Sequence, residues 1–186
     1  MSPAEEHRIV AAAFSRRVRG VPPRGWDARS PVEGWSARDV VRHLLDWLPG
    51  FIESGADIRL TDASSVDDDP AGAWEARCEE VQALLDDPAT EDLTFHNRYT
   101  GDLPLDQAID RYYTPDVFLH TWDLARATDQ DDTLDPERCA RLLEEMQPVD
   151  ELMRTSGQFG PKVEVPSDAD VQTRLLGFIG RDPFRQ

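Results

Sequence analysis

Three side chains in the segment 114–127, TPDVFLHTWDLARA, have the types and the spacing of metal ligands. Asp116, His120 and Asp123 follow one another at intervals of four and three residues, so on a helix they share one face. Tyr112 and Tyr113 fall on the same face, which indicates that it points inward. A buried carboxylate is costly unless it is paired, protonated or bound to a metal. The alternative for Asp116 and His120 alone is a mutual hydrogen bond on a partly exposed face.

A third candidate ligand lies in the segment 34–47, GWSARDVVRHLLDW. His43 falls at the edge of the apolar stripe of this predicted helix, on the side of Trp47, where it could face a neighbouring helix. The alternative is a histidine at the core boundary that is satisfied by a local polar partner. The chain has only four histidines. Because two of them occupy inward positions on the two clearest helices, a shared metal site is a coherent hypothesis.

The composition limits the classes of partner. With 37 acidic and 20 basic residues and a net charge of −17, the chain should repel nucleic acid and anionic membranes. No apolar run approaches the roughly 18 residues of a membrane span. The start, MSPAEEHRIV, lacks the pattern of a signal peptide, so we expect a cytoplasmic protein. Cys78 and Cys139 lack metal-binding spacing and are expected to be reduced.

The periodicity of apolar residues predicts an all-α protein with one domain over residues 1–186. We expect helices over 2–19, 36–54, 71–87, 102–127, 135–154 and 167–180, an extended piece over 161–166, and loops over 21–34, 54–70 and 87–101. Ser2-Pro3 with Glu5 and Glu6 is a good start for the first helix, and Ser36, with Asp39 three residues on, is the expected N-cap of the second. Pro49, Pro115 and Pro148 should kink or interrupt the helices that contain them. Long helices with short connections favour a bundle, in which sites form between facing helices.

The segments GWSARDVVRHL and DVFLHTWDLARAT resemble the two signature blocks of the DinB-like superfamily. More narrowly, they resemble the metal-binding N-terminal domain of actinobacterial mycothiol-dependent maleylpyruvate isomerases, and RLLGFIGRDP resembles the end of stand-alone relatives. The resemblance implies a four-helix bundle with a short extra helix and an extended C-terminal segment. It implies a divalent metal held by His43, Asp116 and His120. The isomerase has Glu at the acid position, so Asp116 departs from it, which bears on geometry and metal preference.

Two imidazoles and one carboxylate leave open coordination positions, as in catalytic zinc sites, and the same donors suit Ni²⁺ or Fe²⁺. Asp123 is placed to accept a hydrogen bond from His120 and orient it; the alternative is pairing with Arg126 or Arg42. A divalent ion lowers the pKa of a bound thiol or water. In the resembled isomerase the thiol is mycothiol, and other DinB-like proteins resemble thiol S-transferases.

The expected function is therefore metal-dependent thiol chemistry, a transferase or an isomerase acting on a small electrophilic substrate, with mycothiol as candidate cosubstrate. The isomerase carries a second, C-terminal domain that has no counterpart here, so its own reaction is not assigned. The alternatives are a non-catalytic metal- or ligand-binding protein and a non-haem iron oxygenase. The oligomeric state is open, with a homodimer among the options.

Four further residues are candidates for a pocket around the metal: Tyr112, Tyr113, His96 and Arg126. A tyrosine hydroxyl could act as an acid or a hydrogen-bond donor. His96 could instead be a solvated loop histidine, and Arg126 could pair with a neighbouring acid. The remaining histidine, His7, is close to the N-terminus and is expected to be exposed.

Trp35 and Trp47 flank His43 and are expected to pack in the core, with a platform for substrate as the alternative.

Overall fold

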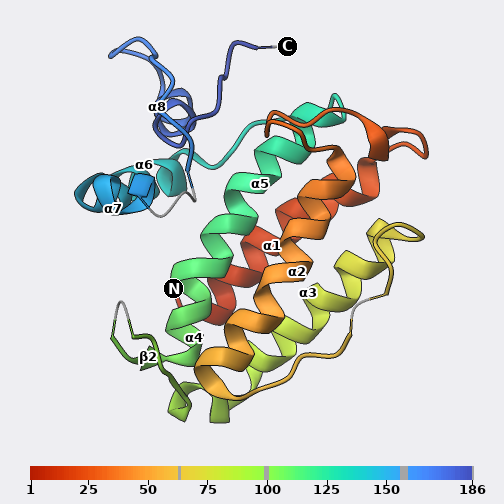
Figure 1. The fold of residues 1–186 in the computed structure, drawn as a ribbon, viewed down its shortest axis with the longest axis vertical. Helices are drawn as coiled ribbons and strands as arrows, with labels where there is room; N and C mark the ends of the chain where they lie inside the picture. The colour runs from red at the N-terminus through yellow and green to blue at the C-terminus, as the bar shows by residue number, and fades with distance from the viewer. Residues whose placement is uncertain (63, 99–100, 156–158, 186) are drawn as a thin grey trace. The chain divides into compact units, whose positions relative to one another are not determined.

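The computed structural model describes residues 1–62, 64–98, 101–155 and 159–185 (Figure 1). The regular secondary structure of these residues is almost entirely helical, which confirms the expected all-α class. The chain divides into two compact units, Met1–Asp132 and Thr133–Gln186. The single domain over 1–186 stays a prediction. The expected loops over 54–70 and 87–101 each include residues outside the described part.

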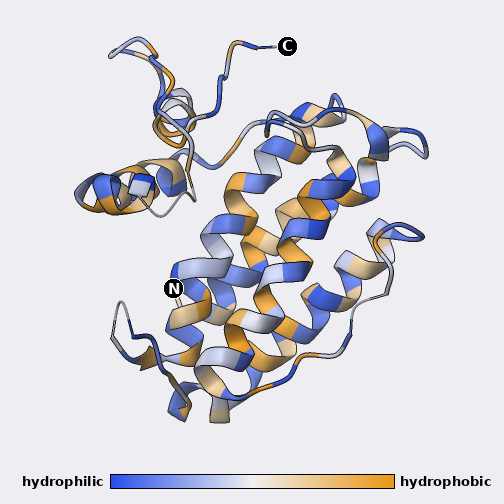
Figure 2. Cartoon of the chain, viewed as in Figure 1, coloured by the Kyte–Doolittle hydropathy of each residue, from blue (hydrophilic) through white to orange (hydrophobic). Residues whose placement is uncertain are grey.

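Four helical segments form the bundle of the first unit. They are α1 (Pro3–Gly20), α2 (Ala37–Ala56), α3 (Pro70–Asp86), and a continuous segment made of α4 (Leu105–Ala108), the π-helical η3 (Ile109–Tyr113) and α5 (Thr114–Ala127). Both α1 and α2 contact α3 and α5 (Figure 1). Apolar and polar residues alternate along the helices (Figure 2), as expected when one face of each helix is buried. The expected four-helix bundle is confirmed.

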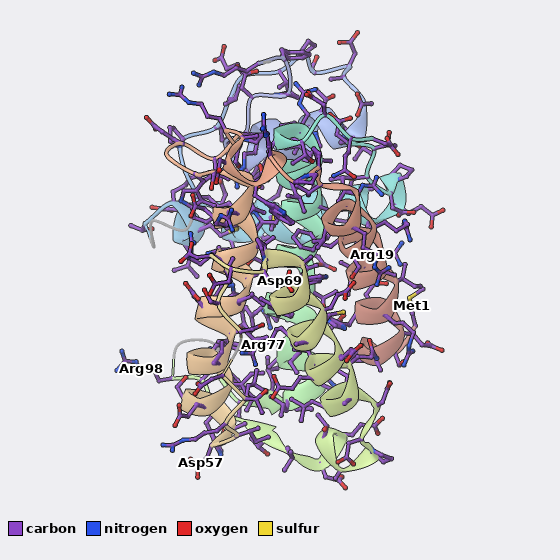
Figure 3. The ribbon with its side chains drawn as sticks, turned by 90° about the vertical axis from the view of Figure 1, so that its right-hand side faces the viewer. Met1, Arg19, Asp57, Asp69, Arg77 and Arg98 are labelled. Carbon is purple, nitrogen blue, oxygen red and sulfur yellow. The ribbon has the colours of Figure 1, made fainter. Side chains whose placement is uncertain are left out.

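The helix starts follow local capping chemistry. Ser2 and Ser36 both accept a hydrogen bond from the backbone N–H three residues on, and the side chains of Glu5 and Asp39 accept from the backbone N–H of Ser2 and Ser36. The capping box predicted at Ser36 is therefore present, and α1 begins with a second one. Asp69 caps α3 in the same way, by accepting from the N–H of Gly72. Figure 3 shows Asp69 at the start of α3. The capping box at Ser36 fixes where α2 begins and therefore which of its side chains face α5.

The prolines affect their helices in different ways. The alternative that Pro49 ends the first half of its helix is wrong, because α2 continues through it to Ala56, and the alternative of a kink stays a prediction. Leu48 and Ile52, on either side of Pro49, are fully buried, and this packing offsets the missing hydrogen bond. Before Pro115 the helix widens into a π-helical turn in which the N–H of Thr114 bonds to the carbonyl of Ile109.

Two predicted connections contain regular structure. The segment expected as a loop over 87–101 includes a 3-10 turn, η2 (Pro88–Asp92), and β1 (Thr94–Phe95), which pairs antiparallel with β2 (Leu103–Pro104). A pairing of two residues is too short for the alternating pattern that identifies a strand. A second 3-10 turn, η1 (Gly25–Asp27), lies in the predicted loop 21–34.

The second unit contains α6 (Pro136–Met146), η4 (Gln147–Val149), α7 (Asp150–Thr155) and α8 (Val171–Phe178). The break at Pro148 takes the form of the 3-10 turn. The predicted start of the last helix at Ser167 is wrong: Asp170 caps α8 by accepting from the N–H of Thr173. Gly180 ends the helical region in the left-handed conformation at φ 86°. The segment 161–166 is neither helix nor paired strand, and its extended conformation stays a prediction.

None of the helices in the described ranges has the length and apolar content needed to cross a membrane. Both cysteines are free thiols, Cys78 half-buried and Cys139 buried.

Substitution of two glycines of α2 tests how tightly the C-terminal part of this helix is packed. A methyl group on Gly55 would collide with the buried ring of Phe95, whereas one on Gly50 would meet nothing within 4 Å. We expect Gly55→Ala to lower the free energy of unfolding by about 1–3 kcal/mol through overpacking. Gly50→Ala should raise it by up to about 1 kcal/mol, because alanine favours the helix. Urea denaturation measures both, and equal effects of the two substitutions would contradict this account.

Candidate metal centre

Three of the predicted ligands meet where α2 faces α5. His43 extends from α2, and Asp116 and His120 extend from α5, one turn apart. One potential ligand atom of each residue lies within 4.8 Å of the others. Within the described residues, this is the one group of three or more histidine, cysteine or carboxylate side chains close enough to share a metal ion. The structure therefore brings together the three residues that the sequence analysis selected.

The two imidazoles present the same ring atom to Asp116. Nε2 of His43 lies 3.0 Å from Oδ2 of Asp116, and Nε2 of His120 lies 3.5 Å from Oδ1. Each carboxylate oxygen thus faces a different histidine. The side chains of His43 and Asp116 are 33% and 24% exposed, whereas that of His120 is 6% exposed. The group is therefore anchored in the core on the His120 side and open to solvent on the other.

Asp123 contacts the opposite nitrogen of His120. Its Oδ2 atom lies 2.8 Å from Nδ1, and the aspartate is fully buried. A proton on Nδ1 that is donated to Asp123 leaves the lone pair of Nε2 directed at Asp116, the tautomer that a metal ligand requires. The two arginines considered as alternative partners also have acidic neighbours: Arg42 donates to Asp39 and Asp67, and Arg126 donates to Asp132.

Asp116 carries a negative charge at neutral pH. Burial raises the pKa of its carboxyl group, but the favourable electrostatic interaction with His120 and hydrogen bonds from His43 and Trp47 outweigh burial, so the pKa lies below its ordinary value. The centre thus offers one anionic oxygen ligand and two imidazole nitrogens. This set fits Zn²⁺, and it also fits Ni²⁺ or Fe²⁺.

Two tryptophans border the centre in different ways. The ring of Trp35 lies against both imidazoles, with centroids 5.0 Å from His43 and 5.7 Å from His120. The indole N–H of Trp47 donates to Oδ2 of Asp116 over 3.0 Å. The expectations for Trp47, packing in the core or a platform for substrate, do not include this bond. Its position one helical turn after His43, together with the need of a buried indole N–H for an acceptor, was the available signal.

The candidate pocket residues lie at different distances from this group. Tyr113 is fully buried, with its ring 5.8 Å from that of Trp47, and burial raises the pKa of its hydroxyl far above the ordinary value. Tyr112 is half-buried against Phe51. His96 is exposed on the hairpin, 3.0 Å from Asp102, and is not part of the three-residue group.

The prediction that His7 is exposed is wrong. The residue is fully buried in α1, with Nδ1 3.0 Å from Oε1 of Gln82 on α3 and its ring stacked on Tyr113 at 6.0 Å. Burial lowers the pKa of His7.

Comparison with known proteins finds a matching family and two relatives. A family model described as the mycothiol maleylpyruvate isomerase N-terminal domain matches residues 7–125, which include all three members of the group. Two uncharacterized Mycobacterium tuberculosis proteins, MT0763 of strain CDC 1551 / Oshkosh and Rv0738 of strain H37Rv, are each 25% identical to the chain. Each match covers 97% of this chain and 98% of the relative. No solved structure matches the chain significantly.

The buried His7 makes a prediction about pH. Because burial lowers its pKa in the folded state, the unfolded chain binds a proton first as the pH falls, and stability present above about pH 6.5 is lost below it. His7→Gln should lose less stability than the wild type between pH 7.5 and 5.5, by at most about 1.4 kcal/mol per pH unit. Urea denaturation in the presence of a chelator measures this, with His96→Gln as the exposed control. Parallel pH profiles for His7→Gln and the wild type would contradict it.

Proposed function

The chain belongs to the mycothiol maleylpyruvate isomerase N-terminal domain family, and on this premise we propose that it is a metal-dependent enzyme of thiol chemistry. His43, Asp116 and His120 hold one divalent ion, and the reaction is a transfer or an isomerisation on a small electrophilic substrate. The observation that carries the proposal is the convergence of one carboxylate and two imidazole nitrogens from α2 and α5 within 4.8 Å.

The exposure of the ligands supports catalysis over a structural role. Structural zinc sites are closed by four protein ligands, whereas catalytic sites have three and keep a position for water or substrate. Here three ligands are grouped, and two of them, His43 and Asp116, are partly exposed to solvent. A small substrate can therefore approach the side of the centre that is opposite the buried His120.

Zn²⁺ fits the donor set best, with Ni²⁺ and Fe²⁺ as alternatives. When bound, a divalent ion supplies a Lewis acid that lowers the pKa of a thiol or a water molecule. The residues of this chain orient the donors: Asp123 fixes the ring of His120, and Trp35 covers one side of both imidazoles. Mycothiol is the thiol that the family description suggests.

The ligand assignment predicts the outcome of two substitutions. His43→Ala and His120→Ala should each abolish stoichiometric Zn²⁺ binding, because two remaining ligands do not make a specific site. The helical content should stay largely intact. Metal analysis and zinc titration of protein purified without a histidine tag measure binding, and circular dichroism measures folding. His96→Ala is the matched control and should bind one ion. Full occupancy in either ligand variant would overturn the assignment.

Turnover then separates the candidate functions. Zinc-loaded protein that consumes an electrophile only when mycothiol is present supports the proposal. Stoichiometric zinc with no thiol-dependent reaction would favour a binding protein. Activity that requires Fe²⁺ and O₂ would favour an oxygenase.

The contact of Asp123 with His120 should have a measurable effect on zinc affinity. Asp123→Asn keeps the size of the side chain but removes the charge that faces Nδ1 of His120, so zinc affinity should fall by about ten- to a hundred-fold. A competitive chelator titration measures the change. Unchanged affinity with an intact fold would show that the hydrogen bond does not orient the ligand.

A further inference from the structure

The two oxygens of Asp116 have different surroundings. Oδ1 lies near Nε2 of His120 at 3.5 Å. Oδ2 has two neighbours at 3.0 Å, Nε2 of His43 and the indole N–H of Trp47. Both imidazole nitrogens can give up their contact with the carboxylate when they bind a metal. The indole nitrogen cannot, because it is a donor only and does not ligate metals. The bond from Trp47 is therefore the contact of Asp116 that a metal does not replace.

Contacts with neighbouring rings hold Trp47 in an orientation that directs its indole N–H at Asp116. It lies one turn after His43 on α2. Its ring packs edge-on against Phe51 at 5.3 Å and against Tyr113 at 5.8 Å. These rings fix the direction of the N–H. The carboxylate has no comparable internal restraint, since the last torsion of an aspartate is broad and nearly two-fold.

We propose that Trp47 is a positioning residue that makes Asp116 a one-oxygen ligand. By holding Oδ2, the indole N–H turns Oδ1 toward the metal position beside His120 and prevents the carboxylate from binding through both oxygens. A carboxylate restricted in this way occupies one coordination position instead of two. The position that it leaves is available to a thiol or a substrate. This inference rests on the proposed metal site and concerns how that site is kept open.

Substitution of Trp47 by Phe tests the proposal, because it keeps an aromatic ring and removes the N–H. We expect Trp47→Phe to bind Zn²⁺ about ten-fold or more weakly than the wild type, as for other groups that orient ligands. With Co²⁺ in place of Zn²⁺, the visible absorption of the variant should weaken, because two-oxygen binding by Asp116 raises the coordination number. A merely structural role for the ring would not change this spectrum. Circular dichroism and urea denaturation check that the variant is folded.

Trp74→Phe is the matched control. The indole N–H of Trp74 donates to Oγ of Ser15 and its ring packs on Phe14, so the substitution removes a buried indole hydrogen bond that involves none of the three ligands, and zinc affinity and the Co²⁺ spectrum should stay close to those of the wild type. The proposal is overturned if Trp47→Phe keeps the wild-type affinity and spectrum, or if Trp74→Phe changes both equally. Failure of the metal site itself is distinguishable, because the wild-type protein would then bind no metal stoichiometrically.

Discussion

The charge on Asp116 is the constraint around which α2 and α5 are arranged. A carboxylate taken out of water costs several kcal/mol unless donors replace the lost solvent. Two of the donors, His43 and Trp47, come from α2, so the two helices must meet in one register for the charge to be satisfied. An apolar side chain at this position would satisfy the packing without that demand. The presence of a charged residue at this position is therefore explained by the site and not by the stability of the fold.

The π-helical turn before α5 contributes to the same arrangement. Pro115 immediately precedes Asp116, and a proline within a regular α-helix collides with the carbonyl four residues earlier. In Ile109–Tyr113 the turn is wider, and the N–H of Thr114 reaches back five residues to Ile109. The proline is thus accommodated, and α5 continues with Asp116 and His120 on the side that faces α2. Such wide turns occur frequently at functional sites.

The candidate ligands on α5 and the capping box of α2 could be predicted from the sequence because both depend on short, local spacings. Asp116 and His120 are one turn apart, and Ser36 and Asp39 define the start of α2 within four residues. The hydrogen bond from Trp47 was missed because an indole can pack, stack or donate, and its type alone does not decide among these.

The prediction that His7 is exposed was wrong for a different reason. The spacing of His7 to Val10, Phe14 and Val18, all buried, continues the apolar stripe of α1 and indicates a buried side chain. A position near the chain terminus indicates the opposite. The path of α2 through Pro49 depends on burial between helices, which no local pattern records.

In the proposed site, the three candidate ligands differ in exposure, and this difference separates the residue that would anchor a metal from those that would give access to it. His120 is the most buried of them, and the carboxylate of Asp123 fixes its ring from the core side. His43 and Asp116 border solvent, where a substrate and an exchanging ligand must pass. If all three were buried to the extent of His120, the donors would enclose an ion without giving access to it. The rigid contacts lie on one side of the centre and the accessible donors on the other, which is the arrangement that chemistry on a bound small molecule requires.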